Sequence, residues 1–283
     1  RIHLDRAVAN YVPARHHANA FLSCQDVGVT SRSVAAMVRY LQGDTAQAMA
    51  VSVDAVSLAE NLKHPFSQAY ALGCAAWFQS YRREPEAMAQ RAAETMALSQ
   101  AQALGWWLLW GMIFAGRGQA DAGQADAGIQ QMEQALGMYR GVGTGMVVPY
   151  FLTQLADAHV MKGDLDRALE RLEDARQLAA QGGEVIASAE IDRLEGEIRW
   201  RRPTANSGAA VGPADAAAVE LLFQRALDTA RRQGARLFEL RAATSLARMG
   251  APNARQILRD VIQGLPEQTE TRDLADAKRA LSE

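Results

Sequence analysis

The sequence is poor in the residues that mark disulfide-stabilised, membrane-spanning and nucleic-acid-binding proteins. Two cysteines in 283 residues cannot build a disulfide framework, and they suit the reducing cytoplasm. No apolar run approaches the roughly 20 residues that cross a bilayer. Because 30 basic residues stand against 32 acidic ones, the basic excess of a nucleic-acid-binding protein is missing. We therefore expect a cytoplasmic protein that binds neither a membrane nor nucleic acid directly.

Sequence motifs for catalysis and for cofactors are missing as well. The glycine-rich stretch GRGQADAGQADAG at 116–128 has no strand before it and no lysine after its last glycine, so it is not a phosphate-binding loop. A nucleophile elbow of the Gly-x-Ser-x-Gly type does not occur. Glu190, Asp192 and Glu195 crowd one segment with Arg193, which indicates a solvated, ion-paired helix face rather than an acid–base site. We expect no enzyme activity, no cofactor and no catalytic residue in this chain.

His16, His17, Cys24 and Asp26 bring together residue types that bind metals. Adjacent histidines with a seven-residue step to a single cysteine match no common zinc pattern, so we expect no metal. Two interpretations stay open for this group. Its members are loop residues that satisfy backbone groups, or His16, His17 and Asp26 form the edge of a ligand pocket at the N-terminal end of a groove.

Nearly all of the chain has the apolar spacing of helices. Apolar residues recur three and four positions apart, as at Val34, Met37, Val38 and Leu41, and alternating strand-like runs are missing. Short stretches of turn-forming residues separate the helical segments. These patterns predict an all-α fold.

Glycine and other small residues at fixed offsets indicate a repeat of about 40 residues. Gly43 and Gly123 are 80 residues apart, and Gly163 follows 40 residues later. Small residues stand five and twelve positions after each glycine: Ala48 and Ala55, Gly128 and Ala135, Ala168 and Ala175. Glycine permits a tight turn with positive φ, and small residues let the next helix lie close. We expect a right-handed α-solenoid of about six helix pairs.

One repeat departs from this pattern, because Arg83, Met88 and Thr95 stand where the other repeats have glycine and two small residues. Its register therefore stays open. We expect one superhelical domain over residues 1–283, with an irregular crossing segment at 12–28, a loop insertion at 201–213 and a capping helix at 271–282. Since the chain begins at Arg1 and not at methionine, we expect it to be a fragment of a longer multidomain protein.

The glycine–alanine spacing resembles the tetratricopeptide repeat in its long-helix form. The segments HPFSQAYALGCAAWFQSYRREPEAMAQRA (64–92), GQADAGIQQMEQAL (123–136), QGARLFELRAATSLAR (233–248) and DLADAKRAL (273–281) look like the C-terminal repeat region of bacterial predicted-ATPase regulators. In that family the repeats follow an ATPase module, often beside a class III adenylate or guanylate cyclase or a winged-helix domain. The resemblance implies a regulatory arm whose partner is a protein, a peptide or its own ATPase, cyclase or DNA-binding module.

The 40-residue period also predicts which side chains share a face. Tyr70, Trp110 and Tyr150 occupy equivalent positions, and so do Trp77, Arg117 and Asp157. In a tetratricopeptide solenoid the first helix of each pair lines the concave groove, so we expect both columns there, with Arg241 adding a polar contact. Aromatic surface suits peptide binding because it gives a large contact area at low entropic cost. The alternative is that these rings pack between repeats.

We therefore expect a non-catalytic interaction and regulatory domain whose groove binds a peptide, a partner or the ATPase module of the same protein. One alternative is a small-molecule sensor in a transcription or cyclase regulator, similar to maltose-regulon-type activators. Another is a structural arm for oligomerisation, which would expose a self-complementary apolar patch.

Overall fold

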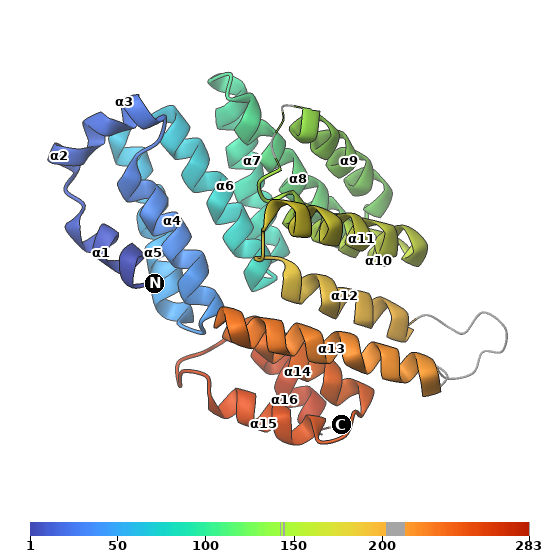
Figure 1. Cartoon of the computed structure of the whole chain (residues 1–283). Coiled ribbons are helices and arrows are strands. Elements are labelled where there is room, and N and C mark those ends of the chain that lie inside the picture. The colour runs from blue at the N-terminus through green and yellow to red at the C-terminus, as the bar shows by residue number, and fades with distance from the viewer. Residues whose placement is uncertain (142, 144, 202–212, 283) are drawn as a thin grey trace. The chain divides into compact units, whose positions relative to one another are not determined.

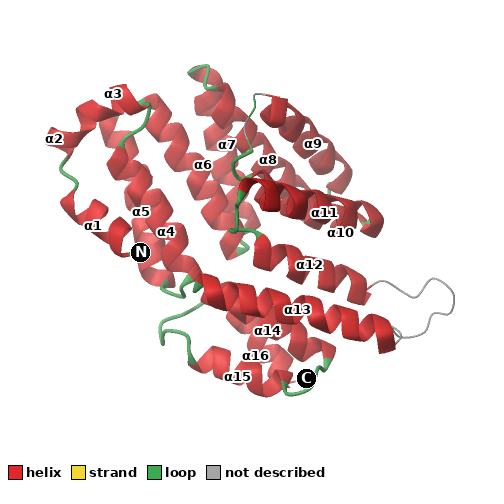
Figure 2. Ribbon diagram, in the orientation of Figure 1, coloured by secondary structure: helices red, strands yellow, loops and turns green. Residues whose placement is uncertain are grey.

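The computed structural model describes residues 1–141, 143, 145–201 and 213–282, and the loop expected at 201–213 lies almost wholly outside them. Within these ranges the secondary structure is helical, without a strand (Figure 2). The chain divides into two compact units. Unit 1 comprises Arg1–Tyr40 and Asp44–Val142, and unit 2 comprises Leu41–Gly43 and Gly143–Glu283.

Unit 1 holds the helices up to α9 (Figure 1). They are α1 (Ile2–Asn10), α2 (Pro13–His16), the 3-10 helix η1 (His17–Asn19), α3 (Ala20–Ser23), α4 (Val27–Leu41), α5 (Thr45–Leu62), α6 (Pro65–Arg82), α7 (Pro85–Ala101), α8 (Gly105–Asp121) and α9 (Ala125–Gly141). The irregular segment expected at 12–28 thus contains three short helices between α1 and α4. Consecutive helices pack against each other from α5 to α9, and α6 also packs against α8.

In unit 2, too, helices that follow one another in the sequence pack together. Its helices are α10 (Val148–Lys162), α11 (Leu165–Gly182), α12 (Ser188–Arg201), α13 (Pro213–Gln233), α14 (Arg236–Met249), α15 (Ala254–Gln263) and α16 (Arg272–Ser282). The first helices of successive pairs, α10, α12 and α14, pack side by side, and α14 also contacts α16. That α16 caps the solenoid stays a prediction.

Local signals explain where the helices begin. Pro65 and Pro85 stand at the starts of α6 and α7, where the missing proline N–H costs nothing. The Asp164 side chain accepts a hydrogen bond from the Arg167 N–H, 3.2 Å away, and so caps α11. None of the described helices is long and apolar enough to cross a membrane.

The repeat glycines make the turns that the spacing predicts. Gly43, Gly123 and Gly163 have φ of +89°, +85° and +85°, values that side-chain-bearing residues rarely adopt. The irregular repeat keeps this backbone, because Arg83 has φ +58°. Met88 and Thr95 follow it at 2% and 0% exposure, which fixes the register that the sequence left open.

Small residues at the other repeat positions let paired helices approach closely. The alanines at 48, 55, 135, 168 and 175 are all at most 2% exposed. Between α8 and α9 the approach is closer still, because a Cβ on Gly116 would lie 2.7 Å from the Gly128 carbonyl oxygen. The repeated pentapeptide therefore spans a turn at Gly123 between two helices in backbone contact.

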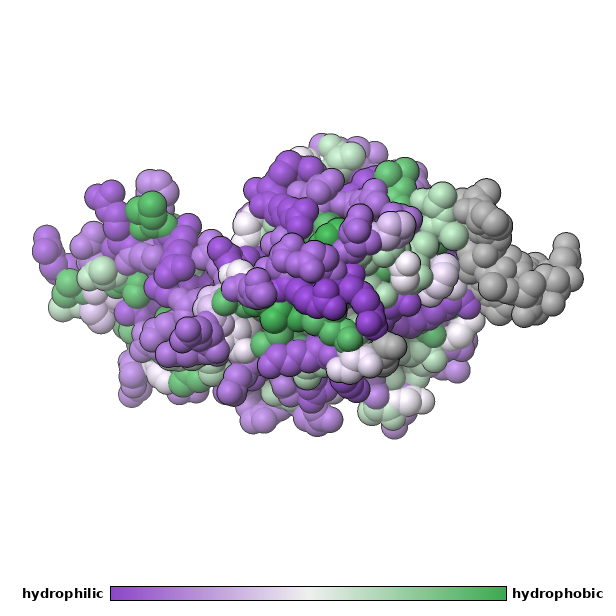
Figure 3. All heavy atoms as spheres, turned by 90° about the horizontal axis from the view of Figure 1, so that it is seen from below, coloured by the Kyte–Doolittle hydropathy of each residue, from purple (hydrophilic) through white to green (hydrophobic). Residues whose placement is uncertain are grey.

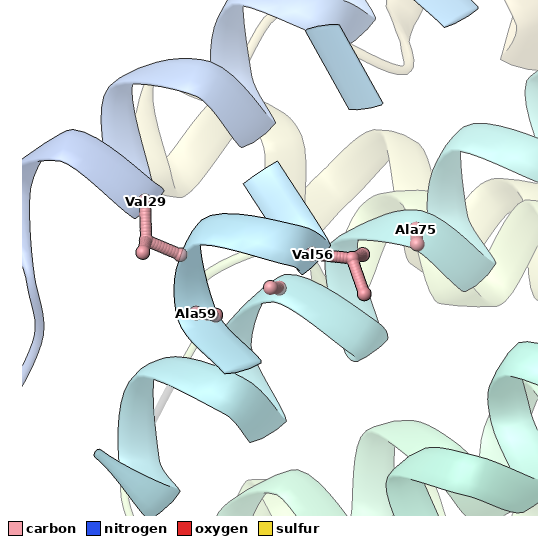
Figure 4. Close-up of a cluster of buried hydrophobic side chains, with 5 residues drawn as sticks. Val29, Val56, Ala59 and Ala75 are labelled. Carbon is pink, nitrogen blue, oxygen red and sulfur yellow. The ribbon is translucent and has the colours of Figure 1, made fainter. Parts of the chain in front are cut away.

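The core of each unit is built from small aliphatic side chains. In unit 1, Val29 of α4 packs with Val56 and Ala59 of α5 and with Ala75 of α6 (Figure 4). In unit 2, Ala156, Ala168, Leu172 and Ile198 form a comparable cluster from α10, α11 and α12. On the face in the space-filling view, hydrophilic side chains predominate and apolar ones gather in smaller patches (Figure 3).

Candidate functional site

The structure brings two of the three predicted pocket-edge residues together in unit 1. Asp26 is fully buried, and its Oδ1 accepts hydrogen bonds from the N–H groups of Gly28 (2.8 Å) and Val29 (3.1 Å) at the start of α4. Its Oδ2 accepts from Tyr11 Oη at 2.8 Å and contacts His17 Nδ1 at 3.2 Å. Asp26 therefore acts as a helix cap that also holds the segment before α4.

His16 does not join this arrangement. Its Nδ1 accepts a hydrogen bond from the Val12 N–H at 2.9 Å, across one turn of the chain. Cys24 is exposed and has φ +63°. No group of three or more metal-ligating side chains converges within the described ranges. His17 and Asp26 thus contact each other, and His16 satisfies a backbone group as one of the two interpretations proposed.

Ser67 of α6 and His64, the residue before α6, complete this N-terminal polar cluster, which comprises Tyr11, His17, Asp26, His64 and Ser67. The Asp26 N–H donates to Ser67 Oγ at 2.8 Å, and Ser67 Oγ lies 2.9 Å from His64 Nδ1. Burial, and then the nearby His17, lower the pKa of His64 below its ordinary value. Sequence reasoning missed Ser67 because it is 41 residues from Asp26.

An aromatic tier connects α6 and α8 in unit 1, and we define it as Tyr70, Trp77, Trp107 and Trp110. The ring of Trp107 lies 5.2 Å from Tyr70 and 5.1 Å from Trp110, and Trp110 lies 5.7 Å from Trp77. These edge-on geometries are the favourable ones for aromatic pairs. Trp77 and Trp110 are 6% and 2% exposed, whereas Tyr70 stays partly exposed.

Burial of the tier reflects its position between two first helices. Trp107 is 4% exposed, and Gly73 of α6 makes room for it, because a Cβ there would lie 3.1 Å from the Trp107 ring. Burial, and then Cys74, raise the pKa of Tyr70. The ring of Trp106 instead contacts Tyr139 of α9, with ring centroids 4.7 Å apart and an interplanar angle of 57°. Tyr70 is therefore the member of the tier whose ring a ligand reaches most readily.

The second predicted column consists of Trp77, Arg117 and Asp157, and its two partly exposed members are polar. Arg117 of α8 is partly exposed and pairs with Asp121 at 3.2 Å. Tyr150 and Asp157 belong to α10 in unit 2, where Tyr150 is 3% exposed and Asp157 is half-buried. Their alignment with the columns of unit 1 stays a prediction.

Ion pairs connect the helices α12, α14 and α16 of unit 2. Glu190 of α12 pairs with Arg193 at 2.7 Å and with Arg241 of α14 at 3.1 Å, and Arg241 also binds Asp273 of α16 at 2.8 Å. We call these four residues the ion-pair tier. Burial alone would raise the pKa of Glu190, but Arg193 and Arg241 outweigh it and lower the pKa to about 2.

This chemistry suits recognition better than proton transfer. A carboxyl with such a low pKa stays ionised near neutral pH and is a poor general acid or base. Arg241, which we expected to contribute a groove contact, is 12% exposed in its side chain and lies 5.4 Å from the Phe238 ring. The ion-pair tier therefore ties three first helices together, with Arg241 at its centre.

No family model matches the sequence, and no curated protein matches it. The fold is similar to that of solved Rap proteins. A Rap protein in complex with competence and sporulation factor aligns with a TM-score of 0.70 and 11% identity, over 99% of this chain and 71% of that protein. The apo form of RapI aligns with a TM-score of 0.57 and 12% identity, over 90% of this chain and 84% of that protein. The chain thus has an all-α fold of tetratricopeptide-like helix pairs.

Proposed function

We propose that this chain is a non-catalytic regulatory domain that binds a peptide or a peptide-like segment of a partner protein on its first helices. The observation that carries the proposal is the fold likeness over 99% of the chain to a Rap protein solved with competence and sporulation factor. Helical repeats of this kind present extended surfaces that suit chain-like ligands.

The residues of unit 1 support a peptide as the ligand. Tyr70 is partly exposed and its ring contacts the buried ring of Trp107, which in turn contacts Trp110, so the tyrosine ring is held in place before a ligand arrives. Arg117 offers a guanidinium on the neighbouring first helix. Tyrosine and arginine are enriched among residues that dominate binding energy, because both combine apolar area with polar groups.

The setting of the domain in a longer regulator is part of the proposal. Its support is the resemblance of the repeat segments to the C-terminal region of bacterial predicted-ATPase regulators. Binding would bias the parent protein only if the ligand had different affinities for two of its states. In that arrangement the ligand is a separate peptide or a segment of the ATPase, cyclase or DNA-binding module, and the site of action is the cytoplasm.

A binding experiment with matched variants tests this function. Peptides are selected with the whole chain from a displayed random library, and their affinities are measured by isothermal titration calorimetry. Arg117→Ala removes a paired arginine from a first helix, and Arg91→Ala removes the equivalent from the second helix α7, where Arg91 pairs with Glu94 at 2.7 Å. We expect Arg117→Ala to weaken binding about tenfold, as an interfacial arginine does, and Arg91→Ala to leave it unchanged.

Thermal unfolding of both variants provides the folding control. The side chains of the Arg117–Asp121 pair are 13% and 17% exposed, against 32% and 35% for Arg91–Glu94, so a loss of stability must be separated from a loss of affinity. Equal affinities for the two variants, or no selectable peptide at all, would overturn the proposal. A response to sugars or nucleotides instead would favour a small-molecule sensor, and concentration-dependent mass would favour an oligomerisation arm.

A further inference from the structure

Three helices of unit 2, α11, α12 and α13, line an open cavity that the peptide-binding proposal does not use. Its volume is about 690 Å³, within the range of sites for small organic ligands. Arg176 enters from α11, Asp192 from α12 and Arg225 from α13. The remaining wall includes the aliphatic side chains of Ala179, Ala180, Val185 and Ile191. The cavity lining therefore combines charged and apolar side chains.

The Arg176 guanidinium at this cavity is paired with two carboxylates. Asp192 is 5% exposed, and its Oδ1 accepts hydrogen bonds from both Arg176 and Arg225. Arg176 also pairs with Glu195, so two carboxylates neutralise it. Arg225 has the longer contact with Asp192, at 3.2 Å, and shares an oxygen atom that Arg176 already occupies. Most donors of the Arg225 guanidinium are thus available to a ligand.

A second arginine on the same face of α13, Arg232, has no ion-pair partner among the described residues. Arg232 lies seven residues after Arg225, which places both side chains on one side of the helix. Arg232 donates a hydrogen bond to Thr229 Oγ1 at 2.8 Å, and no carboxylate within the described residues lies in ion-pair range of it. Both arginines are exposed and line the cavity.

Acidic residues line the cavity beside these arginines. Asp228 is exposed and pairs with Arg231 at 4.0 Å. Glu184 is half-buried, and burial raises the pKa of its carboxyl, although a hydrogen bond from the Val147 N–H at 2.9 Å acts in the opposite direction. Asp192 is shared between Arg176 and Arg225, and Arg225 makes one hydrogen bond to it. Arg225 and Arg232 therefore face the cavity as the guanidinium groups with free donors.

We propose that this cavity binds a small organic anion, with a carboxylate or phosphate head held by Arg225 and Arg232 and an aliphatic body packed on Ala179, Ala180 and Ile191. Guanidinium groups match both head groups in geometry and in charge. The cavity lining contains no aromatic side chain, which argues against a nucleobase or another flat ring. The residues that line this cavity differ from Tyr70 and Arg117, on which the peptide proposal rests, so its ligand acts as a second input to the domain.

Calorimetric titration with simple amphiphiles tests the site in the whole chain. The probes are decanoate and decyl phosphate, with decyltrimethylammonium as the cationic control, all below their micelle concentrations. The double variant Arg225→Gln plus Arg232→Gln removes the two guanidinium groups. Arg231→Gln is the matched control, because it removes an exposed arginine of α13 that does not line the cavity and pairs with Glu239.

We expect both anions to bind the native chain and the Arg231→Gln variant alike, and the double variant to bind at least about tenfold more weakly. Added salt should weaken binding, since the head-group contacts are partly exposed. A preference for decyl phosphate over decanoate, or the reverse, would identify the head group within the proposed class. The proposal is overturned if neither anion binds, if the cation binds as tightly, or if Arg231→Gln weakens binding as much as the double variant does.

Discussion

The backbone contact between α8 and α9 makes a sharp prediction about two glycines of one helix. A Cβ on Gly128 would lie 2.3 Å from the Gly116 carbonyl oxygen and 2.9 Å from the Ala120 nitrogen. Both are backbone atoms that no side-chain rotation can move. A Cβ on Gly137, by contrast, would meet nothing within 4 Å. Alanine should therefore have opposite effects at the two positions.

The magnitude follows from these contacts. An ordinary Cβ contact begins at 3.4 Å, so the Gly128→Ala variant must separate the two helices by about 1 Å. Overpacking of this kind lowers the free energy of unfolding by up to about 3 kcal/mol, and the better helix propensity of alanine offsets about 1 kcal/mol of this loss. We expect Gly128→Ala to lower the free energy of unfolding by about 2 kcal/mol. Gly137→Ala should raise it by about 0.5–1 kcal/mol, because only the propensity changes.

Urea unfolding followed by tryptophan fluorescence measures both effects. Four of the five tryptophans, at 77, 106, 107 and 110, lie in unit 1 with α8 and α9, so the signal reports mainly on the affected unit. The urea midpoints should move in opposite directions at an unchanged slope. The reasoning is refuted if Gly128→Ala is as stable as Gly137→Ala.

Three other substitutions test the register, the ion-pair tier and the aromatic tier. Arg83→Gly should stabilise unit 1 by about 0.5–1 kcal/mol in urea unfolding, because glycine adopts φ +58° without strain; a loss of stability would contradict this. Glu190 has its pKa lowered from 4.5 to about 2, so its ionisation stabilises the fold above about pH 4.5 and this contribution is lost as the pH falls toward 2. Glu190→Gln should therefore cost about 3 kcal/mol near neutral pH and flatten the acid limb of a stability-against-pH curve, whereas an unchanged acid limb would show that Arg193 and Arg241 do not hold the charge. Trp110→Ala should lower the free energy of unfolding by about 3–5 kcal/mol, because the ring is 2% exposed, and a near-native urea midpoint would show that it is not part of the core.

The repeat could be predicted from the sequence because turns and close helix contacts demand particular residues. Gly123 and Gly163 provide the positive φ, and Ala135 and Ala168 allow close packing, so the residue type itself identifies each of these positions in the sequence. Arg83 cannot be identified in this way, because it adopts the same backbone conformation with an ordinary side chain. The register of its repeat is shown by the positive φ of Arg83 and by the burial of Met88 and Thr95.

The candidate site was less predictable because its contacts are distant along the chain. His17 and Asp26 lie nine residues apart and were grouped from the sequence, but the Tyr11 and Ser67 contacts to Asp26 span 15 and 41 residues. Periodicity placed Trp110 on the inward side of α8. It could not separate a groove position from a position between α8 and α6, since both lie on that side.

Photo-crosslinking of a selected peptide tests the central claim most directly. A peptide chosen with the whole chain carries benzoylphenylalanine, and mass spectrometry locates the modified segments. The account predicts adducts on the first helices of unit 1, α6 and α8, near Tyr70 and Arg117. Adducts confined to the second helices α7 and α9, or no adduct with a peptide that binds, would contradict it.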